Sequence, residues 1–209
     1  DSVPHDLWRI TRRGNSAVVS EVAKMIHKHF PGVPVYGAIG NHESFPRDSF
    51  PPPEVPSVWQ RFGVQWLYDA MVREWQRFLP PDSIAPSARF AGCYTLTVSP
   101  GFKIISINTN YCYKFNWWTL FKSVDPGHVL RWLVSELLEA ESNGEYVHII
   151  GHIAPLYEDC YEEWGHQFSR VVTRFSGIIR GQFYGHCHRD EVKLHFDVRE
   201  SKLPVGVEY

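Results

Sequence analysis

The sequence predicts an α/β layered domain, because short apolar runs alternate with segments of helical periodicity along the chain. The alternation is clearest in the second half, where an apolar run ends near His152, a helical segment follows, and another apolar run ends near His186. The chain has 209 residues, 44% hydrophobic and 21% charged, which is enough for one sizeable core. We find no internal repeat and no linker, so we expect a single domain over residues 1–209.

The expected elements follow from their local patterns. Helical periodicity predicts helices at 15–30, 66–79, 126–141 and about 161–175. Apolar or alternating runs predict strands at 33–39, 90–98, 102–108, 146–150, 178–184 and 192–196. The turn sequence Ser99-Pro100-Gly101 joins two of these strands into a pair. The segment 45–56 contains five prolines and little periodicity, so we expect a long loop there.

Composition excludes several functional classes. The net charge of −2 and the absence of a long basic run provide no electrostatic footprint for nucleic acid or for an anionic membrane surface. No apolar stretch is long enough to span a bilayer. The four cysteines form no C-x-x-C pair, which argues against a zinc finger or a thioredoxin-like protein. The chain starts inside a motif at Asp1 rather than with Met, so we expect a piece of a longer protein.

Polar motifs follow three of the apolar runs at the points where strands are expected to end. They are Gly40-Asn41-His42-Glu43-Ser44, Gly151-His152-Ile153 and Gly185-His186-Cys187-His188, with Asp1 and His5 at the start of the chain. Loops at one edge of a sheet bring such motifs together. A carboxylate and several neutral imidazoles are what a dinuclear metal site for cleaving phosphate esters needs.

Each motif has a simpler explanation when it is taken alone. An isolated Asn-His is more often a helix cap or a turn, and an isolated H-x-H is more often a pair of surface or core histidines. The occurrence of all the motifs in this order favours a metal site over these explanations.

The motifs resemble those of the calcineurin-like metallophosphoesterase superfamily, in which G-N-H-[DE], G-H and G-H-x-H occur in this order. Within that superfamily the chain is similar to the acid sphingomyelinase family, through residues 1–6, 40–44, 49–53, 66–68 and 148–153. This resemblance covers nearly the whole chain. It implies an α/β/β/α sandwich that is incomplete at both ends, because an upstream D-x-H strand, a saposin-like domain and a C-terminal region of the family lie outside the chain.

The resemblance also implies two zinc ions per complete domain. Asp1 would bridge them, Asn41, His152 and His186 would complete one site, and His188 would belong to the other. The second site would then have only Asp1 and His188 from this chain. Zinc in proteins takes four ligands, or three and a water molecule, so we expect one well-formed site here.

His42 and His5 would face the phosphate and act in catalysis. In the family pattern a hydroxide held between the zinc ions attacks phosphorus, and His42 protonates the departing ceramide oxygen. The implied reaction hydrolyses sphingomyelin, or a related phosphodiester lipid, to ceramide and phosphocholine. The implied partners are this lipid and, peripherally, a membrane, with no nucleic acid.

Further expectations concern cysteines, tryptophans and location. The family places a disulfide at the positions of Cys112 and Cys160, and it implies a lysosomal or secreted protein. We expect Cys187 to be a buried thiol, because strand alternation would direct it away from its neighbours. Trp117 and Trp118 have the chemistry to line a choline or lipid pocket, although core packing is the favoured role.

There are three alternatives to this family and activity, and the residues argue against the first. Purple acid phosphatases carry an iron-ligating Tyr shortly after the motif Asp, where this chain has Pro4 and His5, which argues against that family. Acid-sphingomyelinase-like phosphodiesterases acting on nucleotides are a closer alternative. The third is a truncated product without turnover.

Overall fold

The described strands form one six-stranded sheet with the order β1-β2-β3-β4-β6-β5. This computed structural model describes residues 1–6, 8, 10–55, 61–80, 83–84, 86–156, 158–196 and 204–208. The strands are β1 (Tyr94–Ser99), β2 (Phe102–Ser106), β3 (Tyr146–Ile150), β4 (Ile179–Phe183), β5 (Lys193–Phe196) and β6 (Pro204–Glu208). Strands β2, β3, β4 and β6 are parallel to their neighbours in that order, and the edge strands β1 and β5 are antiparallel.

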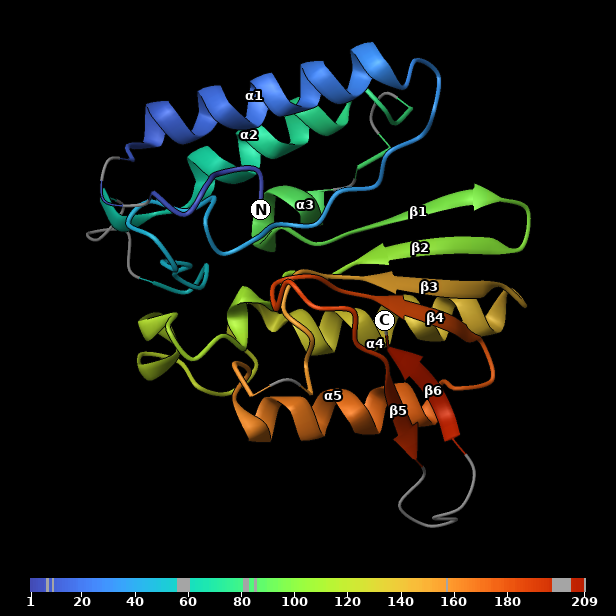
Figure 1. Cartoon of the computed structure of the whole chain (residues 1–209). Coiled ribbons are helices and arrows are strands. Elements are labelled where there is room, and N and C mark those ends of the chain that lie inside the picture. Colours follow the sequence, from blue (N-terminus) through green and yellow to red (C-terminus); the bar gives the residue numbers. More distant parts are fainter. Residues whose placement is uncertain are drawn as a thin grey trace.

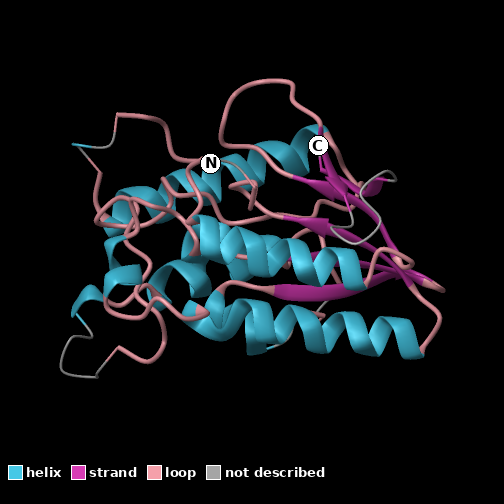
Figure 2. Ribbon diagram, turned by 90° about the horizontal axis from the view of Figure 1, so that it is seen from below, coloured by secondary structure: helices cyan, strands magenta, loops and turns pink. Residues whose placement is uncertain are grey.

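Helices lie on both sides of this sheet (Figure 1). The helices α1 (Arg12–His29), α2 (Gln65–Trp75) and α3 (Pro86–Ala91) lie above β1 and β2, and α4 (Val129–Ser142) and α5 (Glu162–Arg174) lie below. Short 3-10 helices occur at η3 (Thr109–Tyr111), η4 (Trp117–Leu120) and η5 (Pro126–His128). Figure 2 shows many of the loops gathered at the left end, beyond the strands. The predicted α/β fold class is therefore confirmed, and the described strands form a single β layer of it.

Local chemistry explains where the helices begin and which faces they bury. Helix α1 begins after Thr11, whose hydroxyl accepts the N–H of Gly14, and Gly32 follows its end with a φ of +75°. Helix α4 buries Leu133 and Leu137, four residues apart on the face that contacts β2 and β3. Each of these leucines contributes about 1.5–3 kcal/mol through burial. None of the described helices has both the length and the apolar character needed to cross a bilayer.

Segment 33–39 is not the strand that its apolar residues predict. It runs extended (Figure 1) but pairs with no strand among the described residues, and the carbonyl of Gly37 accepts the hydroxyls of Tyr94 (2.8 Å) and Ser106 (3.0 Å). Gly37 also has the indole of Trp75 against it, where an added Cβ would lie 2.2 Å from Nε1. Side chains thus replace the ladder that a neighbouring strand would provide.

Other boundaries differ from the predicted ones. The first part of the predicted strand 90–98 belongs to α3, and the pair around the turn is β1 and β2, with Gly101 at a φ of +78°. Helix α2 ends at Trp75, short of the predicted 79. Strand β6 was not predicted. The predicted loop 45–56 reaches one residue beyond the described residues.

The cysteines behave differently from one another. Cys112 and Cys160 form the disulfide that the resemblance implies, across a sequence separation of 48 residues. Closing a loop of this length contributes roughly 4 kcal/mol in the chain-entropy model. Cys93 is a buried thiol. Cys187 is only partly buried, so that prediction was wrong; its flanking residues His186 and His188 have φ values of +70° and +55°, and strand alternation does not continue there.

Candidate functional site

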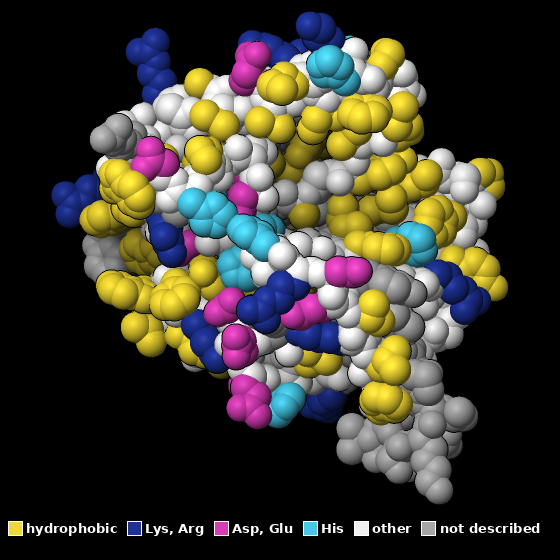
Figure 3. Space-filling model, viewed as in Figure 1, with side chains coloured by type: hydrophobic (Ala, Val, Ile, Leu, Met, Phe, Trp, Pro, Cys, Tyr) yellow, Lys and Arg dark blue, Asp and Glu magenta, His cyan; other side chains and the backbone are white. Residues whose placement is uncertain are grey.

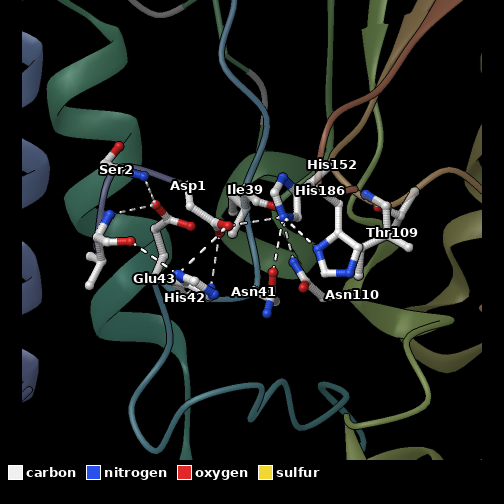
Figure 4. A network of polar contacts seen from close by, with 12 residues as sticks. Asp1, Ser2, Ile39, Asn41, His42, Glu43, Thr109, Asn110, His152 and His186 are labelled. Atoms are coloured by element: carbon white, nitrogen blue, oxygen red, sulfur yellow. Dashed lines mark hydrogen bonds and ion pairs between the residues drawn. The ribbon is translucent and has the colours of Figure 1, made fainter. Parts of the chain in front are cut away.

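The predicted motifs come together where the parallel strands end (Figure 4). His152 follows β3, and His186 follows β4. Asn41 follows the extended segment 33–40, and Asp1 lies beside it. The sequence-predicted grouping of these four residues is what the structure shows.

His152 is the point on which this group converges. Its Nε2 lies 3.0 Å from Asn41 Oδ1, 3.2 Å from His186 Nδ1 and 3.3 Å from Asp1 Oδ2. The side chain of His152 is only 8% exposed, and burial lowers its pKa to about 3. The imidazole is therefore neutral at any physiological pH, which is the form that binds a metal.

Asn41 is oriented by a carboxylate that the sequence analysis missed. Asn41 Nδ2 donates to Asp48 Oδ1 at 2.8 Å, and Arg47 Nε donates to Asp48 Oδ2 at 2.7 Å. Asp48 is 6% exposed and has a φ of +60°, in the left-handed region that Asp tolerates better than most residues. With its amide nitrogen held in this way, Asn41 presents its oxygen to His152. Asp48 stands in the proline-containing loop, where no pattern singles it out.

His42 lies on the other side of Asp1. Its backbone N–H donates to Asp1 Oδ1 at 3.0 Å, and its Nδ1 lies 3.1 Å from the carbonyl of Val3. A carbonyl can only accept, so Nδ1 carries the hydrogen and Nε2 is the proton-exchanging atom. Burial lowers the pKa of His42. The ring of His5 stands edge-on to it, with centroids 4.4 Å apart.

Two buried side chains, Glu43 and Asn15, stabilise the G-N-H-E turn and its contact with the start of the chain. Glu43 Oε1 accepts the N–H groups of Ser2 and Val3, which keeps Asp1 in place. Asn15 Nδ2, from α1, donates to the carbonyls of residues 42, 43 and 44 at 3.4, 3.0 and 3.2 Å. Gly40 has no room for a side chain, because an added Cβ would lie 2.0 Å from Asp1 Oδ1. The motif glycine thus permits the carboxylate to approach the backbone.

His186 has a carboxylate partner as well. Its Nε2 lies 3.2 Å from Asp159 Oδ2, and its ring lies 5.2 Å from that of Tyr113. A carboxylate that accepts from Nε2 fixes the tautomer in which Nδ1 has its lone pair toward His152. Burial lowers the pKa of His186, and Asp159 opposes that shift. Asp159 was also missed by the sequence analysis, since 27 residues separate it from its partner.

His188 and His5 form a looser pair at the surface. Both are exposed, and their ring centroids lie 5.1 Å apart. Within the described residues, the contacts of these two imidazoles are ring contacts. That His188 and Asp1 belong to one metal site stays a prediction.

The donor atoms of the first site fit a divalent metal in kind and in spacing. A tetrahedral site with bonds of 2.0–2.1 Å has ligand atoms about 3.3 Å apart. The three distances from His152 Nε2, 3.0 to 3.3 Å, match that spacing. His152 Nε2 carries either one hydrogen or one lone pair, yet it has three polar neighbours, so it cannot form a hydrogen bond with each of them. A cation bound by all four atoms would remove this mismatch.

Within the described part of the chain, no group of three or more His, Cys, Asp or Glu side chains is already placed to hold a metal ion. The donors of the first site touch one another instead. One of the four is an amide oxygen, which keeps the charge of the site low.

The chain is similar to known proteins over most or all of its length. The family model for calcineurin-like phosphoesterase matches residues 10–190. Human sphingomyelin phosphodiesterase is 39% identical over 209 residues, all of this chain and 32% of the relative, and the bovine protein is 37% identical over the same shares. A human cyclic GMP-AMP phosphodiesterase is 32% identical over 195 residues, 89% of this chain and 40% of the relative. The chain thus spans about a third of the sphingomyelin phosphodiesterases that it matches.

Proposed function

The chain belongs to the calcineurin-like phosphoesterase family, and from that premise we propose that it carries the catalytic site of a zinc-dependent phosphodiesterase that hydrolyses sphingomyelin to ceramide and phosphocholine. The convergence of Asp1, Asn41 and His186 on His152 is the observation that carries this proposal. The family implies a divalent metal. Zinc as its identity is part of the proposal, supported by two imidazole donors, which suit zinc better than magnesium or calcium.

In the proposed site the metal is held by Asp1, Asn41, His152 and His186. When bound, zinc supplies Lewis-acid chemistry that polarises a phosphate oxygen. Asp48 keeps the Asn41 oxygen turned inward, and Asp159 keeps Nδ1 of His186 available.

His42 is the proposed proton donor to the leaving ceramide oxygen. Its Nδ1 is held by the Val3 carbonyl, so Nε2 takes up and delivers the proton. Although burial lowers the pKa of His42, a phosphodiester anion beside the ring favours its protonated form. His5 is the proposed second contact to the phosphate, from its place edge-on to His42.

Two experiments on the 209-residue chain test this proposal together. Elemental analysis after dialysis should find one zinc per chain, and none in His186→Ala. Sphingomyelin in mixed micelles should release phosphocholine. Zinc binding without release would support the non-catalytic alternative, and no zinc at all would overturn the proposed site.

A nucleotide diester is the second candidate substrate, favoured by the 32% identity to a cyclic GMP-AMP phosphodiesterase. The chain is more similar to the human and bovine sphingomyelin phosphodiesterases, at 39% and 37% identity, and this supports the lipid. A competition assay in which sphingomyelin and a cyclic dinucleotide are offered together measures the ratio of their kcat/KM values. A ratio in favour of the dinucleotide would reverse the assignment.

We also propose a lysosomal or secreted location. The Cys112–Cys160 disulfide supports it, because disulfides persist in oxidising compartments. Localisation of the tagged protein in cells, with protease protection, measures this directly.

A further inference from the structure

One loop beside the site exposes an unusual number of large apolar side chains. Within residues 113–124, here called the docking loop, five such residues are 49–80% exposed: Phe115, Trp117, Leu120, Phe121 and Val124. Two of them lie in η4: Trp117 is 75% exposed and Leu120 is 80% exposed. Figure 3 shows apolar side chains gathered on the left of the molecule, near a group of histidines. Contiguous apolar surface of this kind marks an interaction site.

The docking loop is held rigidly from inside, with its polar groups inward. Asn116 is fully buried, and its amide donates to the carbonyls of Phe50 and Asn110 at 3.1 and 3.0 Å while accepting the N–H of Phe50 at 3.1 Å. Thr119 Oγ1 donates to the Asn116 carbonyl, and Trp118 Nε1 donates to Ser49 Oγ. The usual arrangement of a surface loop is thereby inverted. The apolar side chains are presented outward on a fixed base.

The docking loop starts at the catalytic site. The ring of Tyr113 lies 5.2 Å from that of His186, and the N–H of Lys114 donates to the carbonyl of Asp159 at 2.8 Å. Asp159 in turn contacts His186 through its carboxylate. A surface on which this loop rests is therefore next to the site.

The charges of the loop suit a lipid surface. Residues 113–124 contain Lys114 and Lys122 and no acidic residue, and Lys122 is paired with Glu54 outside the loop, Nζ to Oε1 2.6 Å. With a net chain charge of −2, however, attraction to anionic lipids cannot be the main driving force. The apolar side chains must supply it, and Trp and Lys are suited to the boundary between headgroups and acyl chains.

We propose that residues 113–124 form a membrane-docking surface that inserts Trp117 and Leu120 into a zwitterionic phospholipid bilayer and brings the site to the headgroups. The inference rests on the proposed function, because a sphingomyelin phosphodiester lies at this boundary. A bilayer presents acyl chains to Trp117 and Leu120 and phosphate groups to Lys114. Cleavage then occurs at the headgroup without extraction of the lipid.

Sedimentation with vesicles of phosphatidylcholine and sphingomyelin tests docking, using the 209-residue chain. Trp117→Ala/Leu120→Ala should weaken binding at least tenfold, since each buried side chain of this size is worth about tenfold or more. The matched control is Met25→Ala/Leu138→Ala, which removes two side chains of 53% and 50% exposure from α1 and α4. It should bind as the unmodified chain does. Equal loss in both variants, or in neither, overturns the proposal.

Two more measurements separate docking from its competitors. Binding should persist in about 0.5 M salt, where exposed charges are screened, and its loss there would overturn insertion. Trp117→Phe should retain binding but lose part of the fluorescence quenching by brominated lipid; unchanged quenching would place Trp117 outside the bilayer. If the double variant dissociates a dimer and binds vesicles normally, the surface instead joins two copies of the chain.

Failure of docking is distinguishable from failure of the proposed function. Vesicle binding is measured with no turnover, and hydrolysis of the water-soluble bis(4-nitrophenyl) phosphate is measured with no vesicle. The docking variant should hydrolyse this soluble diester as the unmodified chain does. A docking variant that loses soluble-diester hydrolysis as well would show that the loop acts on the site itself and would overturn the docking role.

Discussion

The two halves of the candidate site differ in how firmly the fold holds them. Around His152, donors from three separate segments lie 3.0–3.3 Å from one nitrogen, and polar partners orient them. The pair of His5 and His188 is exposed and is held by ring contacts. The half that has all four donors in this chain is thus the half that the fold has buried and oriented. The half with more donors is thus also the half whose donors are better oriented. Variants in each half test whether metal binding follows the same division.

The largest effect on zinc affinity is expected from His186→Ala. This change leaves three of the four donors of the ordered half. It also removes the imidazole that Asp159 orients, so we expect zinc affinity to fall at least about 100-fold. Competition with a chromophoric chelator measures this affinity. His166→Ala, an exposed histidine of α5, is the control. Unchanged affinity in His186→Ala would exclude this half as the metal site.

His42→Ala should separate binding from turnover. The side chain contacts Val3 and lies beside Asp1 without converging on His152. We therefore expect zinc to remain bound while kcat falls about 10²–10⁴-fold, the usual contribution of a general acid. Zinc content and kcat measured on the same preparation decide this. Loss of the metal in this variant would overturn the division of roles.

Asp48→Ala should weaken zinc binding by about 10–100-fold, as is typical when a partner of a ligand is removed. The Asn41 amide then loses the acceptor that holds its nitrogen. Asp48→Asn keeps an oxygen for that hydrogen bond and should recover part of the affinity. Equal affinity in both variants would show that Asp48 does not orient Asn41.

Acid should destabilise the metal-free protein through His152. The folded-state pKa is about 3 and the ordinary value is 6.5, so the unfolded chain binds more protons between them. This stabilisation is present above pH 6.5 and is lost as the pH falls toward 3, by about 1.4 kcal/mol per pH unit. Denaturant unfolding at pH 7, 6 and 5 measures the slope. His152→Gln should reduce it, and an unchanged slope would contradict the assignment.

The smallest effect is expected from His188→Ala. Its ring is exposed and contacts His5, so affinity for the first zinc should change less than about fivefold. The same chelator titration used for His186→Ala measures it. A loss as large as that of His186→Ala would show that both halves bind one metal and would remove the contrast between them.

The sequence predicted which residues meet at His152 better than it predicted what orients them. Asn41, His152 and His186 stand in motifs directly after apolar runs, and the parallel order of β3 and β4 brings their loops together. Asp48 and Asp159 have no motif of their own. Their importance arises from contacts with residues elsewhere in the chain, which a single sequence does not display.

The errors in secondary structure have the same origin. An apolar run such as 33–39 indicates burial, but whether it becomes a strand depends on a neighbour with which to pair. Here the hydroxyls of Tyr94 and Ser106 donate hydrogen bonds to the Gly37 carbonyl instead. For Cys187, alternation was assumed past the end of β4, where the backbone turns with His186 at a φ of +70°.

The Cys112–Cys160 disulfide has a practical consequence for producing the protein. Cys112 directly precedes the docking loop and Cys160 directly follows Asp159, so one covalent bond anchors both the apolar surface and the partner of His186. We expect protein made in a reducing bacterial cytosol to be deficient in lipid binding and in metal content together. Periplasmic or secretory expression is therefore the sound choice of host compartment, and assays on cytosolic material would understate both properties.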